Sequence, residues 1–292
     1  MSAPAIRILS TAVHRPGPDG KIGDDLLVRD RRSPKVGALS EKMRFLLAAT
    51  GPCLGAAGGA RPAIGVSLGT LLGAGDVAQR TLTVARQSGF VSVTPSWYAT
   101  GLANAATAIV ASFHDLQGPN LTFLGYQSGI DAIIMACRMI RGGRAPAMLA
   151  GGFDWPGEGG AVRFGRSGGP VQPAAGLVLL DGTAGKASPG EASGPAILGW
   201  SQGWTGSDGD DWWAPLVDRA LAGTARAGVI PTVHLIRPSV SGVVDYLAAG
   251  APVHLADVIL APGSAGAHAL VVRGWGPAAA CLLVEAGPAC GR

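Results

Sequence analysis

Cysteine and histidine, which most often act as nucleophiles, bases or metal ligands, are few and widely separated in this sequence. They are Cys53, Cys137, Cys281, Cys290, His14, His114, His234, His254 and His268. No CxxC pair or Cys/His cluster occurs among them, so the sequence suggests neither a structural zinc site nor a disulfide framework. We expect no bound metal and no cofactor.

A tight turn at residues 125–129 separates a short strand-like run from a helical pattern. A thiol at such a helix start would be activated, because the amide dipoles stabilise the thiolate and lower its pKa. The turn contains Tyr126 but no cysteine, and a tyrosine with a free pKa of about 10 is a poor nucleophile at neutral pH. The nearest cysteine, Cys137, lies further along the apolar face of the helix, so we interpret it as a buried core thiol.

Alternating strand and helix patterns must position this turn. Compact apolar runs predict strands at residues 5–13, 63–70, 120–124, 147–150 and 176–180. Helical spacing predicts helices that begin near residues 40 and 97, and another over residues 130–137 that ends at residues 142–143. Strands that alternate with helices favour an α/β fold with a layered sheet.

The later part of the sequence is less regular. A loop rich in glycine and proline covers residues 155–173, and a polar linker at residues 186–194 divides a half at 1–185 from a half at 195–292. Further predicted elements are strands at 196–200, 257–260, 269–272 and 280–284, and a helix at 213–227.

Three segments, in order, resemble the β-ketoacyl synthases. They are residues 118–122 (Gly-Pro-Asn-Leu-Thr), 125–132 (Gly-Tyr-Gln-Ser-Gly-Ile-Asp-Ala) and 149–152 (Leu-Ala-Gly-Gly). In that family they correspond to a Gly-Pro strand, the nucleophile turn with Ser-Gly-x-Asp-Ala, and a strand that ends in Ala-Gly-Gly. Residues 176–181 resemble the segment that closes the family's first half. The resemblance implies a thiolase-like, layered αβαβα fold with a shortened second half.

The resemblance also implies that the catalytic residues are missing. Aligned on Ser128 and Gly129, Tyr126 stands at the position of the family's nucleophilic cysteine, with Gln127 adjacent. The family's histidine motifs, His-Gly-Thr and Lys-x-x-x-Gly-His, do not occur. One alignment sets residues 261–264 against the first motif, with Pro262 in place of the histidine. Another sets residues 228–238 after the second motif, and neither alignment supplies a catalytic histidine.

Cysteine-less relatives of this kind, the chain-length factors of type II polyketide and aryl polyene systems, pair with an active ketosynthase. The resemblance therefore implies a non-catalytic partner that shapes the acyl tunnel and supports the heterodimer in type II polyketide or fatty-acid-like biosynthesis. We expect no catalytic residue, with Tyr126 filling the space of the acyl sulfur. Two alternatives stay open: unorthodox acyl-transfer or malonyl-decarboxylase chemistry that uses Tyr126 and Gln127, and a carrier-protein-binding scaffold.

Composition bears on the partners. Only 14% of the residues are charged and 48% are apolar, which fits a surface partly covered by another subunit. Basic residues gather at Arg29, Arg31, Arg32, Lys35, Lys42, Arg44, Arg138, Arg141 and Arg144. They form either a solvated face or a dock for an acidic partner such as an acyl carrier protein.

The sequence also argues against other partners and compartments. No aromatic residues interleave with the basic clusters, so we expect no nucleic acid. No apolar run reaches the ~18 residues of a membrane span, and no signal segment is evident at the start, so we expect a cytoplasmic protein.

Overall fold

The computed structural model describes residues 5–16, 39–57, 63–73, 75–156, 171–182, 194–205, 211–222, 224, 230–237, 247–261, 264–273 and 277–286. Several predictions from the sequence fall outside these ranges. They concern the basic residues from Arg29 to Lys35, most of the 155–173 loop, most of the 186–194 linker, Pro262 and Cys290.

The first half contains five strands and the helices between them. Its strands are β1 (Ile6–His14), β2 (Ile64–Thr70), β3 (Asn120–Leu124), β4 (Ala147–Asp154) and β5 (Ala174–Asp181). Its helices are α2 (Glu41–Leu54), α3 (Gly75–Ser88), α4 (Pro95–Thr100), α5 (Ala105–His114) and α6 (Ser128–Arg141), with short 3₁₀ turns η2 (Gly55–Ala57) and η4 (Phe90–Ser92).

The second half has four strands in the described residues. Its elements are β6 (Ala196–Trp204), α8 (Ala214–Ala222), β7 (Thr232–Ile236), η7 (Leu247–Ala249), α9 (Gly250–His254), η8 (Leu255–Ile259), β8 (Ala267–Arg273) and β9 (Ala278–Glu285).

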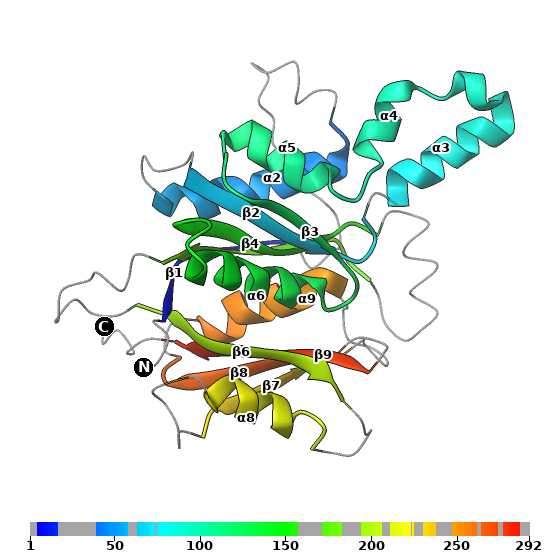
Figure 1. Cartoon of the computed structure of the whole chain (residues 1–292). Coiled ribbons are helices and arrows are strands. Elements are labelled where there is room, and N and C mark those ends of the chain that lie inside the picture. The colour runs from blue at the N-terminus through cyan, green and yellow to red at the C-terminus, as the bar shows by residue number, and fades with distance from the viewer. Residues whose placement is uncertain are drawn as a thin grey trace.

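The elements stack in five layers (Figure 1). Helices α2 and α5 cover the strands of the first half, α6 and α9 lie between the two groups of strands, and α8 covers the strands of the second half. All nine strands are linked in the order β3-β2-β4-β5-β1-β6-β9-β8-β7. Within the residues that the structure describes, the two groups of strands pair with each other where Ile6 and Arg7 of β1 face Ile197 and Ala196 of β6. The predicted layered αβαβα fold is therefore confirmed.

The two halves repeat one pairing scheme. Strand β2 runs parallel to β4, β4 antiparallel to β5, and β5 antiparallel to β1. Strands β7, β8, β9 and β6 repeat these relations in the second half. The first half adds β3 beside β2, whereas the described residues of the second half contain no counterpart of β3. The second half is thus the shorter one, as expected, while the boundary at residues 186–194 stays a prediction.

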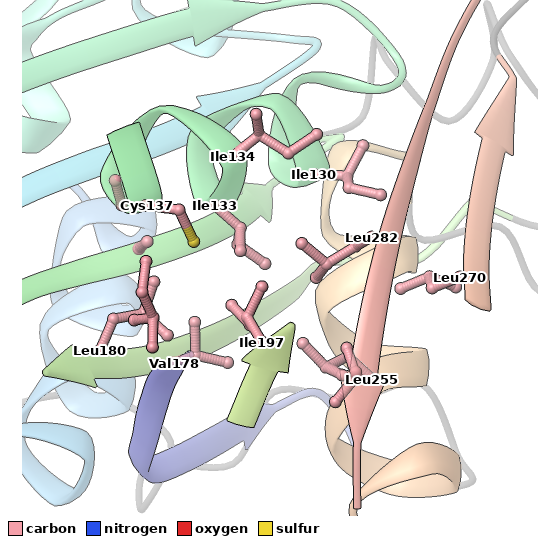
Figure 2. Close-up of a cluster of buried hydrophobic side chains, with 14 of the residues drawn as sticks. Ile130, Ile133, Ile134, Cys137, Val178, Leu180, Ile197, Leu255, Leu270 and Leu282 are labelled. Carbon is pink, nitrogen blue, oxygen red and sulfur yellow. The ribbon is translucent and has the colours of Figure 1, made fainter. Parts of the chain in front are cut away.

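The apolar stripe of α6 fills the central layer. Ile130, Ile133, Ile134 and Cys137 are buried there, as the helical spacing predicts. Figure 2 shows them facing a common core, whose other labelled members are Val178, Leu180, Ile197, Leu255, Leu270 and Leu282. Burial raises the pKa of the Cys137 thiol to about 12, so Cys137 is the inert core thiol that the sequence predicted.

One predicted strand is wrong. Residues 257–260 belong to a continuous helical stretch made of η7, α9 and η8. The Leu260 N–H donates to the Leu255 carbonyl at 2.9 Å, which closes a π-helical turn. The local sequence is a short apolar run, and periodicity cannot distinguish a strand from a buried helical segment over so few residues.

Two further differences concern helices. The helix expected from residue 97 is divided into α4 and α5 at residues 101–104, and α3 was not expected at all. Helix α3 is largely exposed and lies outside the layered body in Figure 1, whereas the helices predicted from the sequence are those whose apolar face packs into a core.

Close backbone packing of α6 against the second half requires a glycine at position 129. A Cβ there would lie 2.0 Å from the Ala248 carbonyl oxygen and 3.0 Å from the Pro252 ring. We therefore expect Gly129→Ala to lower the free energy of unfolding by about 3 kcal/mol in urea titrations. The added methyl group would collide with a backbone carbonyl, which cannot move aside as a flexible side chain can. Gly250→Ala, in α9 itself, is the control: its Cβ meets nothing within 4 Å, so stability should stay the same or rise by about 0.5 kcal/mol.

Candidate functional site

The turn before α6 is fixed to the end of β2. Gly125 has a φ of 135°, a backbone conformation that favours glycine. Its N–H donates to the Thr70 carbonyl at 3.1 Å, and the Ser128 N–H closes the turn on the Gly125 carbonyl at 3.2 Å. A Cβ on Gly69 would lie 2.1 Å from the Ser128 carbonyl carbon, so β2 passes directly beside the start of the helix.

Tyr126 points from this turn into the protein. Its side chain is 7% exposed and belongs to the central core. Its hydroxyl donates to the Arg237 carbonyl at 2.8 Å, just beyond the end of β7. A buried tyrosine needs such a partner, and this one ties the turn of the first half to a strand of the second.

Gln127 occupies the N-cap position of α6 and belongs to a polar network on that helix. Its side chain hydrogen-bonds to Asp131. The Gln202 amide donates to the Asp131 carboxylate at 2.6 Å, and Arg138 donates to the Gln202 carbonyl at 2.7 Å. Burial raises the pKa of Asp131, opposed by hydrogen bonds from Gln202 and Gln127 and by the charge of Arg138. This network joins α6 to β6.

Asp154, which the sequence analysis did not single out, lies at the same end of the sheet. Its buried carboxylate accepts hydrogen bonds from the Thr70 hydroxyl at 2.8 Å, from the Leu72 N–H at 2.9 Å and from the Ala248 N–H at 2.9 Å. The Leu71 N–H also donates to it, at 3.1 Å. Burial raises the pKa of Asp154, and these hydrogen bonds oppose the rise. An aspartate at the end of a wholly buried strand is the sequence signal that could have identified it.

None of the five histidines belongs to the turn at residues 125–129. His14 packs on Phe45, and His114 hydrogen-bonds to Thr50 of α2 at 2.7 Å. His234, His254 and His268 form a chain between β7, α9 and β8, which the sequence analysis missed. His234 lies three residues before Arg237 on an extended strand, so roughly 10 Å of backbone separate it from the Tyr126 contact.

Neither the other thiols nor a metal cluster adds reactivity. Burial raises the pKa of Cys53 to about 11 and that of Cys281 to about 12, so both stay protonated at neutral pH. Among the described residues, no group of three or more histidine, cysteine or acidic side chains could hold a metal ion. No helix in the same residues is long and apolar enough to cross a membrane.

The geometry places a helix N-terminus, a turn and a sheet end where the resemblance sets the family's nucleophile. Residues 29–177, about half of the chain, match the family model "Beta-ketoacyl synthase, N-terminal domain". The chain belongs to the β-ketoacyl synthase family. A comparison with curated proteins gave no match.

Solved structures of ketosynthases share the fold. The ishigamide ketosynthase/chain length factor is 18% identical with a TM-score of 0.72, over 97% of this chain and 99% of that one. The AntDE ketosynthase bound to a hexaketide, in complex with the type II PKS acyl carrier protein AntF, is 12% identical with a TM-score of 0.72, over 99% and 100%. An oxazolomycin ketosynthase domain from Streptomyces albus is 16% identical with a TM-score of 0.61, over 98% and 96%. At these identities the likeness shows the fold.

The Tyr126 contact leads to a prediction about stability. Tyr126→Phe removes one hydrogen bond and should lower the free energy of unfolding by about 1 kcal/mol. Tyr126→Ala also empties a core position and should cost about 3 kcal/mol or more. Phe90→Ala is the matched control, because that ring is 80% exposed and its loss should change stability by less than about 0.5 kcal/mol. Equal losses for Tyr126→Ala and Phe90→Ala in urea titrations would contradict the buried position of Tyr126.

Proposed function

We propose that this chain is a non-catalytic partner of an active β-ketoacyl synthase, in the manner of a chain-length factor, in type II polyketide or fatty-acid-like biosynthesis. The observation that carries the proposal is Tyr126 at the start of α6, with its ring buried and its hydroxyl bonded to the Arg237 carbonyl. A side chain held in this way fills the place where the family resemblance puts the acyl-carrying sulfur.

The surroundings of Tyr126 do not favour nucleophilic chemistry. A tyrosine hydroxyl requires a neighbouring base to take its proton before it can attack an acyl group. The backbone carbonyl of Arg237, to which the hydroxyl donates, cannot take up a proton. Gln127 is bonded to Asp131 in a structural network. These contacts support the non-catalytic proposal over the alternative in which Tyr126 and Gln127 perform acyl transfer.

A pairing surface is available at the β3 edge of the sheet. Strand β3 is the last in the strand order, and Leu124 at its end is 64% exposed. Beside it, α3 and α4 extend away from the layered body (Figure 1). Phe90 and Val91, between these helices, are 80% and 101% exposed. An unpaired strand edge next to exposed apolar side chains is typical of a protein–protein interface.

The exposed helices have a defined conformation in the single chain. The Arg80 guanidinium lies 4.1 Å from the centre of the Trp97 ring, which joins α3 to α4 by a cation–π contact. We propose that the β3 edge and these helices together contact the ketosynthase. The titles of two structural neighbours describe a ketosynthase/chain length factor and a ketosynthase with its carrier protein, which supports this choice of partner.

The basic residues on α6 do not by themselves identify a carrier-protein dock. Arg138 donates to Gln202, and Arg141 donates to the Leu198 carbonyl and stacks on Trp200 at 4.0 Å. Because Arg138 and Arg141 both make contacts within the chain, we propose that an acyl carrier protein is recognised by the heterodimer and not by these two side chains alone.

The proposal predicts no condensation by the isolated chain. Incubated with malonyl- and acyl-carrier protein, the purified protein should give no product above background by mass spectrometry, because Tyr126 replaces the thiol. Tyr126→Cys should be equally inactive, because the family's histidine motifs, His-Gly-Thr and Lys-x-x-x-Gly-His, do not occur in this chain. A condensation or decarboxylation product that depends on this chain would support the alternative enzymatic function.

The proposal also predicts a 1:1 complex with the cognate ketosynthase. Co-expressed proteins should elute together in size-exclusion chromatography at micromolar concentration. Leu124→Asp should weaken the complex by tenfold or more, because it places a charge in an apolar interface. Leu235→Asp, on an exposed side chain of the opposite sheet edge, is the control and should leave elution unchanged. Separate elution of the two wild-type proteins would contradict the chain-length-factor proposal and favour the scaffold.

A further inference from the structure

Three histidines form a continuous hydrogen-bonded chain across three elements of the second half. Nε2 of His254, at the end of α9, lies 3.0 Å from Nδ1 of His234 on β7. Nε2 of His234 lies 3.1 Å from Nδ1 of His268 on β8. Nε2 of His268 lies 3.2 Å from the Ala265 carbonyl oxygen. The order along the chain is therefore His254, His234, His268 and a backbone carbonyl.

The carbonyl at one end fixes the protonation of every ring. A carbonyl oxygen only accepts, so His268 must carry its proton on Nε2, which leaves its Nδ1 as an acceptor. His234 must then donate from Nε2, and His254 must donate from Nε2 in turn. The neutral chain has one consistent arrangement, with all three histidines in the Nε2–H tautomer.

We propose that His254, His234 and His268 form a pH-sensitive latch that holds α9 and the π turn η8 against β7 and β8. The first added proton can bind Nδ1 of His254, which takes no part in the hydrogen bonds between the three histidines. None of those hydrogen bonds is then broken. A second proton must occupy the accepting Nδ1 of His234 or His268. Two N–H groups would then face each other at a nitrogen–nitrogen distance of about 3 Å. Their repulsion would open the latch.

The charged groups near His254 are Asp257 and Arg15. Asp257 lies three residues further along the same helical stretch, and its charge favours protonated His254. Arg15, just after β1, pairs with that carboxylate and screens it. Burial nevertheless lowers the pKa of His254 below its usual value, as does the neighbouring His234.

The charged groups on the strands face elsewhere. Glu285 of β9 is opposite Ala267, one position before His268, so alternation puts it on the other face of the sheet. Arg237 and Arg273, at the far ends of β7 and β8, lie 5.0 and 5.3 Å from the Trp212 ring. Burial lowers the pKa of His234, and the charge of His268 lowers it further.

Opening the latch would act on the candidate site. Helix α9 connects the latch at His254 to Pro252 and Ala248, which contact Gly129 at the start of α6. The pKa values of His234 and His254 are depressed in the folded protein, so the unfolded chain binds more protons as pH falls. The contribution of these histidines to the free energy of unfolding is therefore at its full value above a pH of about 6.5. It is lost as the pH falls below that value.

Urea denaturation of the full chain between pH 5 and pH 8 tests the latch. The unfolding equilibrium constant of the wild type should rise by about tenfold or more from pH 7 to pH 5, because the unfolded chain binds more protons than the folded protein over that range. His234→Gln should remove most of that rise. His114→Gln removes a histidine that is not one of the three linked ones, so the rise in the unfolding equilibrium constant should remain. Equal pH dependence in both variants would overturn the proposal.

A second measurement does not depend on how the variants fold. Long-range ¹⁵N–¹H NMR spectra of the wild type at pH 8 should show three Nε2–H imidazoles, and the titrations of His234 and His254 should be coupled and lie below the usual range. The same spectra recorded on the complex with the ketosynthase, if that complex forms, test whether the three histidines are linked in the assembly as well. An Nδ1–H tautomer at His268, or independent titrations of His234 and His254 near pH 6.5, would show that the three histidines are not joined in this way.

Discussion

The close approach of helices α6 and α9 between two layers of strands is the constraint on which the rest of the structure depends. Both helices pass so near to backbone that glycine is required at their contacts. A Cβ on Gly152 would lie 2.2 Å from the Ala248 carbonyl, and one on Gly176 would lie 2.6 Å from the Val253 nitrogen. The glycines of the Ser-Gly and Ala-Gly-Gly motifs therefore serve this packing.

Asp154 complements this apolar contact with a polar one. Its carboxylate gathers N–H groups from the loop after β2 and from η7, so one buried group fixes both halves at the end of the sheet where the turn of Tyr126 lies. A charge in such a place is tolerated only with several hydrogen bonds. The site is therefore held from two sides, by the packing of α6 and α9 and by the hydrogen bonds of Asp154.

The sequence was sufficient for the elements that have strong local patterns. The stripe Ile130, Ile133, Ile134 and Cys137 predicted α6, and the compact runs predicted strands β1 to β6, β8 and β9. The strand predicted at residues 257–260 was wrong because a π turn in a buried apolar run has no distinctive periodicity. The contacts of Asp154 and the chain of three histidines could not be predicted for another reason. Each joins residues that are distant in sequence, such as His234 and His268, and the folded arrangement of strands and helices brings these residues together.

The shared central layer has a consequence for synthesis on the ribosome. The apolar face of α6 is complete once about half of the chain has been made, yet Leu255, Leu270 and Leu282, which cover it, come from the last part of the sequence. At roughly 5–20 residues per second, that face waits for several seconds without its cover. Contacts of such high sequence separation form slowly. Until those final strands have been made, the uncovered apolar face of the nascent chain is a site at which aggregation can begin.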